Sequence, residues 1–342
     1  MKDRESSFEL LRLIAQYMIV VYHILLFWFV LEGPNPQPIF KALWIPLHIG
    51  VILYVLISGY FGIRFSIKGV LRIVSQLLIY GLGLYLLNHF IYGDPIKIKQ
   101  LFFVSNTPYW FIRTYLFLYL LAPMVNKAIA NISLITRIVL LAILSWISCW
   151  TGLMGFDVSM HEGYNVIHFV FLYLIGNTLY IYRDMFNSIP VYLVLGIYAI
   201  GAIGGMLMVY ALPDNALLFN VLFQYNSLVL ILNAVLLFML FMKMHFQSRT
   251  INYMASSCLA IYLLHGSDVL FRHEIKEGAM WIQNLTKTGG QIALVFVFAL
   301  VIVLACVGID KCLTPLWNLV RRGADKLTQT KFGKIIEEYS YR

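Results

Sequence analysis

Long apolar runs, separated by short polar breaks, follow one another along the chain of 342 residues. A helix that crosses the hydrocarbon core of a bilayer needs about 20 mostly apolar residues. The runs are continuously apolar and about twice as long as the alternating strands of a transmembrane barrel, so the pattern predicts membrane-spanning helices. Ten spans are predicted, at residues 8–31, 42–62, 70–91, 108–126, 134–152, 165–182, 190–212, 217–242, 252–271 and 289–309.

The first apolar run follows Lys2 and Arg4, a charge pattern that a secretory signal peptide also has. However, the run is longer than the apolar region of a signal peptide, and no small-residue cleavage site precedes Gly33 and Pro34. We therefore expect this run to be retained as the first helix.

The composition agrees with an integral membrane protein. Hydrophobic residues make up 61% of the chain and charged residues only 12%, whereas about 25% of the residues in a soluble domain are charged. We expect one all-α domain over residues 1–342, a polytopic transmembrane helix bundle with a basic tail at 310–342. Neither an internal repeat nor an appended soluble domain is evident.

The basic residues are distributed unevenly between the two sides of the predicted bundle. Ten spans leave both termini on one side, where the tails and loops hold 17 basic residues, against six on the other side. The other two of the 25, Arg12 and Arg113, fall inside spans. The positive-inside rule therefore predicts that both termini are cytoplasmic. The net charge of +9 then reflects loops and a tail beside anionic membrane lipid, and we expect no nucleic-acid partner.

The first predicted helix carries a polar stripe, in which Glu9, Arg12, Gln16 and His23 are spaced by 3, 4 and 7 residues. This spacing puts all four on one helix face. Arg12 and His23 lie about 16 Å apart along the axis, so His23 is deep in the membrane when Arg12 is near the cytoplasmic edge. Such residues normally face a polar cavity. The alternative is that Arg12 is an anchor paired with Glu9 and that His23 is a packing residue.

Histidines recur in the predicted spans at the outer level of the membrane. Several at one level favour a polar cavity in which protons are transferred, because imidazole takes up and releases a proton near neutral pH. The histidines inside spans are His23, His48, His89, His168 and His265.

The fourth predicted span begins with Tyr109, Trp110 and Arg113. The two aromatic residues fit an interfacial aromatic belt. A belt does not account for Arg113, which brings a permanent positive charge to a depth similar to that of His23 and His265.

A second basic group, formed by Arg64, Lys68 and Arg72, surrounds the connection between the second and third predicted spans. It can act as a topology determinant, or it can bind phosphate groups. A donor with phosphates at the cytoplasmic face and a long arm reaching toward His23 would connect this group with the first helix. Coenzyme A has that shape.

Metal binding is not predicted. The four cysteines, Cys149, Cys258, Cys306 and Cys312, lie in or beside spans and lack the paired spacing of metal ligands. We expect them to be packing residues.

Four segments occur in order along the chain: FELLRLIAQYMIVVYH, LISGYF around Ser58 and Gly59, YWFIRTYLFLYLLAP from Tyr109 to Pro123, and SSCLAIYLLH ending at His265. Together they resemble the membrane-bound acyltransferase-3 family. In that family the first helix carries an acidic residue, an arginine and, after ten residues, a histidine, and here Glu9, Arg12 and His23 fill these places. One position departs from the family, because Gly69 stands where a first arginine often precedes Arg72, and Lys68 is a possible substitute.

The resemblance implies transfer of an acyl group, usually acetyl, from cytoplasmic acyl-CoA to a hydroxyl of an envelope or exported glycan or a lipid-linked sugar. It also implies a multi-pass protein of the cell membrane that uses acyl-CoA as a co-substrate without a permanently bound cofactor. Imidazole can serve as a base or as an acyl carrier, and both roles remain open for His23. Arg113 or a neighbouring polar group is expected to stabilise the developing oxyanion.

These arguments give three sets of candidate site residues. The catalytic set is His23, Arg113, His265 and Glu9; the donor-binding set is Arg12, Arg64, Lys68 and Arg72; and the acceptor-binding set is Tyr109, Trp110 and Tyr262.

Two other functions compete with acyl transfer. A secondary transporter also carries Glu, Arg and His inside the membrane. Transporters commonly consist of repeated halves, and no convincing repeat is present in this sequence. A glycan polymerase or exporter is the second alternative.

Overall fold

The computed structural model describes residues 5–34, 36–93, 95, 109–150, 162–267 and 270–330, together with positions 333, 334, 336 and 339 of the tail. Within these ranges every regular element is helical and there is no strand. The predicted all-α class is therefore confirmed.

The helices follow one another closely, and several predicted spans consist of two consecutive helices. Their bounds, in chain order, are α1 (Ser6–Ile24), η1 (Leu25–Leu31), α2 (Pro38–Ala42), α3 (Trp44–Leu47), α4 (Gly50–Phe61), α5 (Ile67–Tyr92), α6 (Trp110–Ile129), α7 (Leu134–Ser145), η3 (Trp146–Trp150), α9 (Val166–Ile181), α10 (Arg183–Ser188), α11 (Val191–Ala211), α12 (Ala216–Phe223), α13 (Leu228–Met242), α14 (Arg249–Ala255), α15 (Cys258–His265), η5 (Leu270–Ile275), α16 (Lys276–Leu285), α17 (Thr288–Cys312) and α18 (Thr314–Gln329).

Among the described residues, six helical segments are long and apolar enough to cross a membrane. They are Ser6–Leu31, Pro38–Phe61, Ile67–Tyr92, Val191–Ala211, Val221–Met242 and Thr288–Cys312.

Helices also occupy the other four predicted spans, as α6, α7 with η3, α9, and α14 with α15. The predicted spans 108–126, 134–152 and 252–271 extend at residues 108, 151–152 and 268–269 outside the described residues. Ten membrane crossings therefore remain a prediction.

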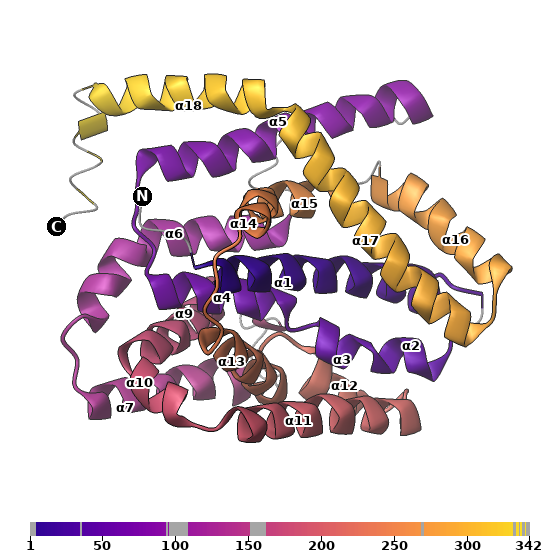
Figure 1. Cartoon of the computed structure of the whole chain (residues 1–342), viewed down its shortest axis with the longest axis horizontal. Coiled ribbons are helices and arrows are strands. Elements are labelled where there is room, and N and C mark those ends of the chain that lie inside the picture. Colours follow the sequence, from indigo (N-terminus) through magenta and orange to yellow (C-terminus); the bar gives the residue numbers. More distant parts are fainter. Residues whose placement is uncertain are drawn as a thin grey trace.

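Helix α1 lies in the middle of the bundle. It runs beside α4, and it also packs against α13, α14, α15 and α17, the last of which crosses it obliquely (Figure 1). This central position explains why buried residues occur along its whole length, from Ser6 to Ile24. The polar stripe of the first helix therefore faces other helices.

Two glycines bring α4 and α9 into close contact. A β carbon on Gly59 would lie 2.1 Å from the carbonyl oxygen of Tyr173, and one on Gly176 would lie 2.2 Å from the carbonyl oxygen of Leu56. Small residues allow such backbone approach between helices in membranes. This contact fixes the position of α4, whose other face carries Tyr54 and Ser58 toward α1 and α6.

The ninth predicted span is interrupted. Helix α14 ends at Ala255, and Ser256 and Ser257 form a turn before α15 begins at Cys258. The break brings polar groups into the bundle, because the Ser257 hydroxyl donates to Asp310 at 2.6 Å.

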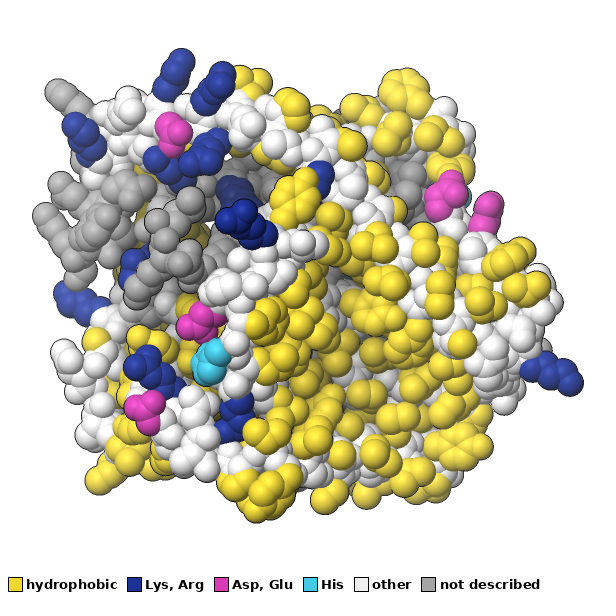
Figure 2. All heavy atoms as spheres, viewed as in Figure 1, with side chains coloured by type: hydrophobic (Ala, Val, Ile, Leu, Met, Phe, Trp, Pro, Cys, Tyr) yellow, Lys and Arg dark blue, Asp and Glu magenta, His cyan; other side chains and the backbone are white. Residues whose placement is uncertain are grey.

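The segments on either side of the last predicted span, expected as a loop and a tail, contain the helices α16 and α18. Helix α18 runs along α5 at one edge of the bundle (Figure 1). Most Lys and Arg side chains seen in Figure 2 gather over the end of the molecule where both termini lie in Figure 1, whereas the adjoining broad face is largely hydrophobic.

Candidate functional site

The structure brings two predicted catalytic histidines into contact. Nδ1 of His23, on α1, lies 3.1 Å from Nε2 of His265, the last residue of α15, although 242 positions separate them in the sequence. The rings are stacked, with centroids 5.2 Å apart and an interplanar angle of 25°. His265 is buried and His23 is half-buried.

The surroundings of His265 determine how the pair carries its protons. Nδ1 of His265 lies 2.6 Å from the carbonyl oxygen of Ile261, which can only accept a hydrogen bond. In the neutral pair Nδ1 of His265 therefore carries the hydrogen of that ring. In the hydrogen bond between the two rings, Nδ1 of His23 donates and Nε2 of His265 accepts. Nε2 of His23 is then the ring nitrogen without a hydrogen, and it is the atom that can take a proton or attack an acyl carbon.

His23 lines a cavity of about 580 Å³, named here the His23 pocket. The predicted acceptor-binding residues Tyr109, Trp110 and Tyr262 all line it. The Tyr109 hydroxyl donates to the carbonyl of Leu263 at 2.9 Å and thereby joins α6 to α15. Most of the other lining side chains are also aromatic or apolar: Ile19, Tyr22, Leu26, Phe27, Trp28, Val51, Phe111, Tyr164 and Tyr225, with Gly266 and the charged residues Glu32 and Lys276.

The two charged residues of the His23 pocket pair with each other. The Lys276 ammonium lies 3.2 Å from the Glu32 carboxylate and 5.1 Å from the centroid of the Trp28 ring. The charges of this pocket therefore lie at its exposed rim, since 41% of the Lys276 side chain and 52% of the Glu32 side chain are exposed.

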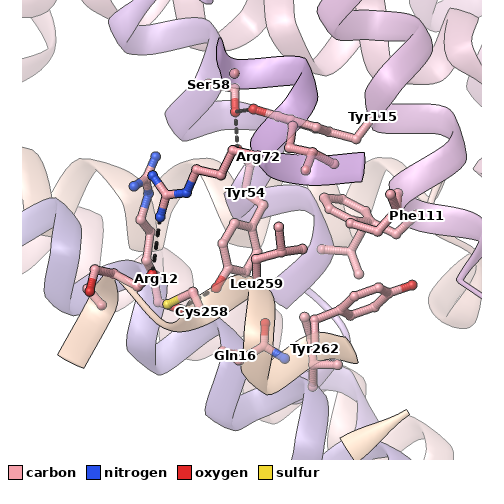
Figure 3. A pocket seen from close by; sticks show the side chains of 17 residues that line it. Arg12, Gln16, Tyr54, Ser58, Arg72, Phe111, Tyr115, Cys258, Leu259 and Tyr262 are labelled. Carbon is pink, nitrogen blue, oxygen red and sulfur yellow. Dashed lines mark hydrogen bonds between the residues drawn. The ribbon is translucent and has the colours of Figure 1, made fainter. Parts of the chain in front are cut away.

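A second cavity of about 280 Å³, the central pocket, lies beside the His23 pocket. Arg12 and Gln16 of the polar stripe line it, and Figure 3 shows Arg12 on one side of it, with Tyr54 and Tyr262 also at its wall. The Tyr54 hydroxyl donates to the carbonyl of Arg12 at 2.9 Å. The Arg12 guanidinium lies 3.5 Å from the buried Glu9 carboxylate, so Glu9 supports Arg12 and does not itself line the pocket.

A third cavity of about 560 Å³, the basic pocket, is formed by α5, the turn before α15, α17 and α18. Its cations are Lys68, Arg72, Lys311 and Arg321. The Arg72 guanidinium donates to the carbonyl of Ser256 at 3.4 Å, and the Lys311 ammonium donates to the hydroxyl of the same serine at 2.6 Å.

Lys68 of the basic pocket is joined to α18. Its ammonium lies 2.7 Å from the carboxylate of Asp325. This hydrogen bond lowers the pKa of the Asp325 carboxyl below its ordinary value, so the pair stays charged at neutral pH.

The three pockets form a row. The central pocket shares Gly69, Arg72 and Ser256 with the basic pocket. At its other end it shares four residues with the His23 pocket, namely Ile19, Val51, Phe111 and Tyr262. A continuous series of lining side chains thus leads from the basic surface to the histidine pair.

Two predicted site residues lie elsewhere. The side chains of Arg113 and Arg64 are exposed, and neither residue lines one of the three pockets. Arg113 directly follows the buried Ile112 on α6, and its own side chain points away from the bundle interior. The sequence indicates the depth of a residue in a helix but not the direction in which its neighbours lie.

Gly69, the departure from the family pattern, lies between the basic and central pockets. A β carbon at this position would lie 2.0 Å from the Tyr119 hydroxyl. That hydroxyl is held by the carbonyl of Arg64, to which it donates at 3.2 Å. A larger side chain at position 69 would therefore collide with Tyr119.

Several polar residues that line the pockets were not predicted from the sequence as site residues. Asp310 of the basic pocket accepts hydrogen bonds from Tyr80 at 2.7 Å, Ser257 at 2.6 Å and Trp317 at 3.0 Å. The sequence signal that could have identified Asp310 is its position as an acidic residue at the end of a long apolar run. The others are Tyr54, Ser58, Tyr115 and Cys258 in the central pocket and Lys311 and Arg321 in the basic pocket.

The remaining intramembrane histidines do not line the His23 pocket. His168 is buried, with Nδ1 at 2.8 Å from the Ser148 hydroxyl. His48 stacks on Tyr225 at a centroid distance of 4.2 Å and meets Tyr22 edge-on at 4.5 Å, and both tyrosines line the pocket. Within the described part of the chain, no group of three His, Cys, Asp or Glu side chains is placed to hold a metal ion.

The chain matches a known protein family. The model of the family described as an acyltransferase domain matches residues 5–310, which include α1, α15 and most of α17 but not α18. No curated protein and no solved structure matches the chain significantly.

Proposed function

Because the chain belongs to the acyltransferase-3 family, we propose that it transfers an acyl group, most simply acetyl, from cytoplasmic acyl-CoA to a hydroxyl of a glycan on the opposite side of the membrane. Its apolar helices and its family indicate a membrane protein whose activity is acyl transfer. The single observation that supports this donor and acceptor is the row of pockets joining a basic surface to the histidine pair.

On the donor side, the basic pocket suits the phosphate groups of coenzyme A, because Arg and Lys form charge-assisted hydrogen bonds with phosphate oxygens. The thioester arm is long and uncharged, and apart from Arg12 and Arg72 the side chains that line the central pocket are also uncharged. Arg12, in the central pocket, and His23 are about 16 Å apart along α1, a distance that an extended arm has to cover.

At His23, the reaction needs only groups that the pocket and the two substrates supply. As a base, Nε2 takes the proton of the acceptor hydroxyl, whose oxygen attacks the thioester carbonyl; the carbon–sulfur bond breaks, and the thiolate leaves and receives the proton. As an acyl carrier, Nε2 attacks the carbonyl first, the carbon–sulfur bond breaks and the thiolate leaves. The acceptor hydroxyl then attacks the acyl carbon, the bond between that carbon and Nε2 breaks, and the hydroxyl proton passes to the thiolate. In both routes His265 accepts the hydrogen bond from Nδ1 and stabilises the positive charge that develops on His23.

On the acceptor side, the His23 pocket offers aromatic faces with few polar groups, which is typical of sites that bind a small molecule by its apolar faces. The C–H faces of sugar rings match Tyr109, Trp110 and Tyr262. The Glu32–Lys276 pair at the rim offers a donor and an acceptor for sugar hydroxyls.

This assignment requires both chain termini on the cytoplasmic side. Single cysteines at Gly93 and Gln329, introduced into a cysteine-free variant, then label with an impermeant thiol reagent from opposite sides of the membrane. Both positions are exposed. Labelling of both from outside the cell would overturn the predicted topology, on which the direction of transfer depends.

The proposed reaction is tested by the release of free thiol from acetyl-CoA by the purified protein, in the presence and absence of glycan acceptors. The expected result is acceptor-dependent thiol release with label from the acetyl group recovered on the glycan. A transporter or exporter would move the glycan across a vesicle membrane without consuming thioester, and that result would exclude acyl transfer.

A further inference from the structure

Helix α18 supplies one wall of the basic pocket, although it lies beyond the residues that match the family. Four polar or aromatic positions recur on one face of this helix, and Arg321 is the cation among them. The α18 residues that line the pocket are Thr314, Trp317, Asn318, Val320, Arg321 and Ala324.

Helix α18 is held in this position by specific contacts. Near its start, the Trp317 indole donates to Asp310 at 3.0 Å, and its ring lies 5.4 Å from that of Tyr80. Near its end, Asp325 pairs with Lys68 at 2.7 Å. Both ends of the pocket wall are thus joined to α5 or α17.

The charge of the basic pocket is strongly positive. Asp310 is its one lining carboxylate, against four lining cations, and its oxygens already accept three hydrogen bonds from Tyr80, Ser257 and Trp317. Asp325 neutralises Lys68. Arg72, Lys311 and Arg321 leave an excess of positive charge that suits a ligand with several negative charges.

We infer that α18 is a recognition element for the phosphate-bearing part of the thioester donor, in which Arg321, together with Lys311 of α17, binds donor phosphates in the basic pocket. This inference rests on the proposed function, because the donor is taken to be a coenzyme A thioester. It makes α18 a determinant of donor affinity and leaves the reaction itself to the histidine pair at the other end of the row.

The test compares two neighbouring arginines in the full-length protein. Arg321→Gln removes a charge that lines the pocket, whereas Arg322→Gln removes the same charge from an exposed position that does not line it. Initial rates are measured with acetyl-CoA and with S-acetylpantetheine, a thioester without phosphates.

For Arg321→Gln we expect KM for acetyl-CoA to rise about tenfold, the effect of losing one charge-assisted hydrogen bond, with kcat nearly unchanged. KM for S-acetylpantetheine stays the same, Arg322→Gln resembles the unmodified protein with both donors, and Arg321→Lys recovers part of the affinity. The inference is wrong if Arg321→Gln and Arg322→Gln have equal effects, or if Arg321→Gln impairs both donors equally.

Equilibrium binding of coenzyme A, which needs no turnover, separates this inference from the proposed function. Binding that weakens about tenfold in Arg321→Gln but not in Arg322→Gln supports the role of α18, even if no acyl transfer occurs. Binding that is unchanged in Arg321→Gln, in a protein that does transfer acetyl groups, overturns the role of α18 and leaves the reaction intact.

Discussion

The basic pocket and the His23 pocket have nearly equal volumes, about 560 and about 580 Å³, but different walls. Four cations surround the first, whereas nine aromatic side chains and a histidine surround the second. In the His23 pocket the charged side chains, Glu32 and Lys276, pair with each other at the exposed rim. Charged side chains are thus concentrated in the basic pocket at one end of the row, whereas in the His23 pocket at the other end they line only the rim.

This difference follows from the cost of charge inside a membrane, which is a few kcal/mol or more for each unpaired group. Groups that recognise a charged donor belong at the membrane edge. Groups that react at depth have to be neutral before the reaction, and imidazoles that share a hydrogen bond satisfy this condition. The contrast predicts that substitutions in the two pockets affect different kinetic parameters.

The largest effect is expected for His23→Ala. Removal of the proposed base or acyl carrier should lower kcat about 10²- to 10⁴-fold without loss of the fold. Expression, thermal stability and acyl transfer are measured together, with His89→Ala on α5 as the control, because His89 lines none of the three pockets. A stable His23→Ala protein with a nearly normal rate of acyl transfer would contradict the proposal that His23 acts as a base or an acyl carrier.

The next effect concerns His265, which positions His23 by accepting a hydrogen bond from it. His265→Ala should lower kcat about 10- to 100-fold, the range that applies when a group that orients a metal-ligating histidine is lost. His265→Gln, whose amide oxygen can accept the same hydrogen bond, should recover part of the rate. A purely structural role predicts instead that activity follows thermal stability in both variants.

Arg72→Ala tests the other end of the row. Coenzyme A binding should weaken by about 1.5–3 kcal/mol, the range for one hydrogen bond to a charged group. The value of kcat at saturating donor should change little, in contrast to the histidine variants. Unchanged affinity in the folded variant would make Arg72 a topology determinant only.

The smallest effect is expected at the junction of the basic and central pockets. Gly69→Leu should cost about 1 kcal/mol in donor binding, near the lower end for overpacking, because the Tyr119 side chain can move. Gly83→Leu is the matched control on the same helix, since no heavy atom lies within 4 Å of a β carbon built there. Equal donor affinity in the two variants would show that the donor does not pass the junction.

Much of the helical framework could be predicted from the sequence, because long apolar runs report membrane burial directly. The stripe from Arg12 to His23 could also be predicted, since helical periodicity is local. The break at Ser256 and Ser257 could not be, because it lies inside an apolar run and is stabilised by Asp310, 53 positions from Ser257.

The candidate site was harder to predict, because it depends on which sides of the helices pack against each other. His23 and His265 were both identified, but their contact joins residues 242 positions apart. The same limitation explains the exposed Arg113. Its depth in the membrane could be predicted from the sequence, but the direction in which its side chain points around the helix could not. Helix α18 was predicted only as part of a basic tail, because a search for continuously apolar runs passes over a helix with one polar face.

The central claim is that an acyl group passes from a donor on one side of the membrane to an acceptor on the other through the row of pockets. Sealed vesicles with the protein in one orientation test it most directly. Labelled acetyl-CoA is supplied only at the face that carries the termini, and glycan acceptor only at the opposite face. The account predicts labelled glycan, and none when His23 is replaced by alanine. Transfer that occurs only when both substrates are on the same side would contradict it.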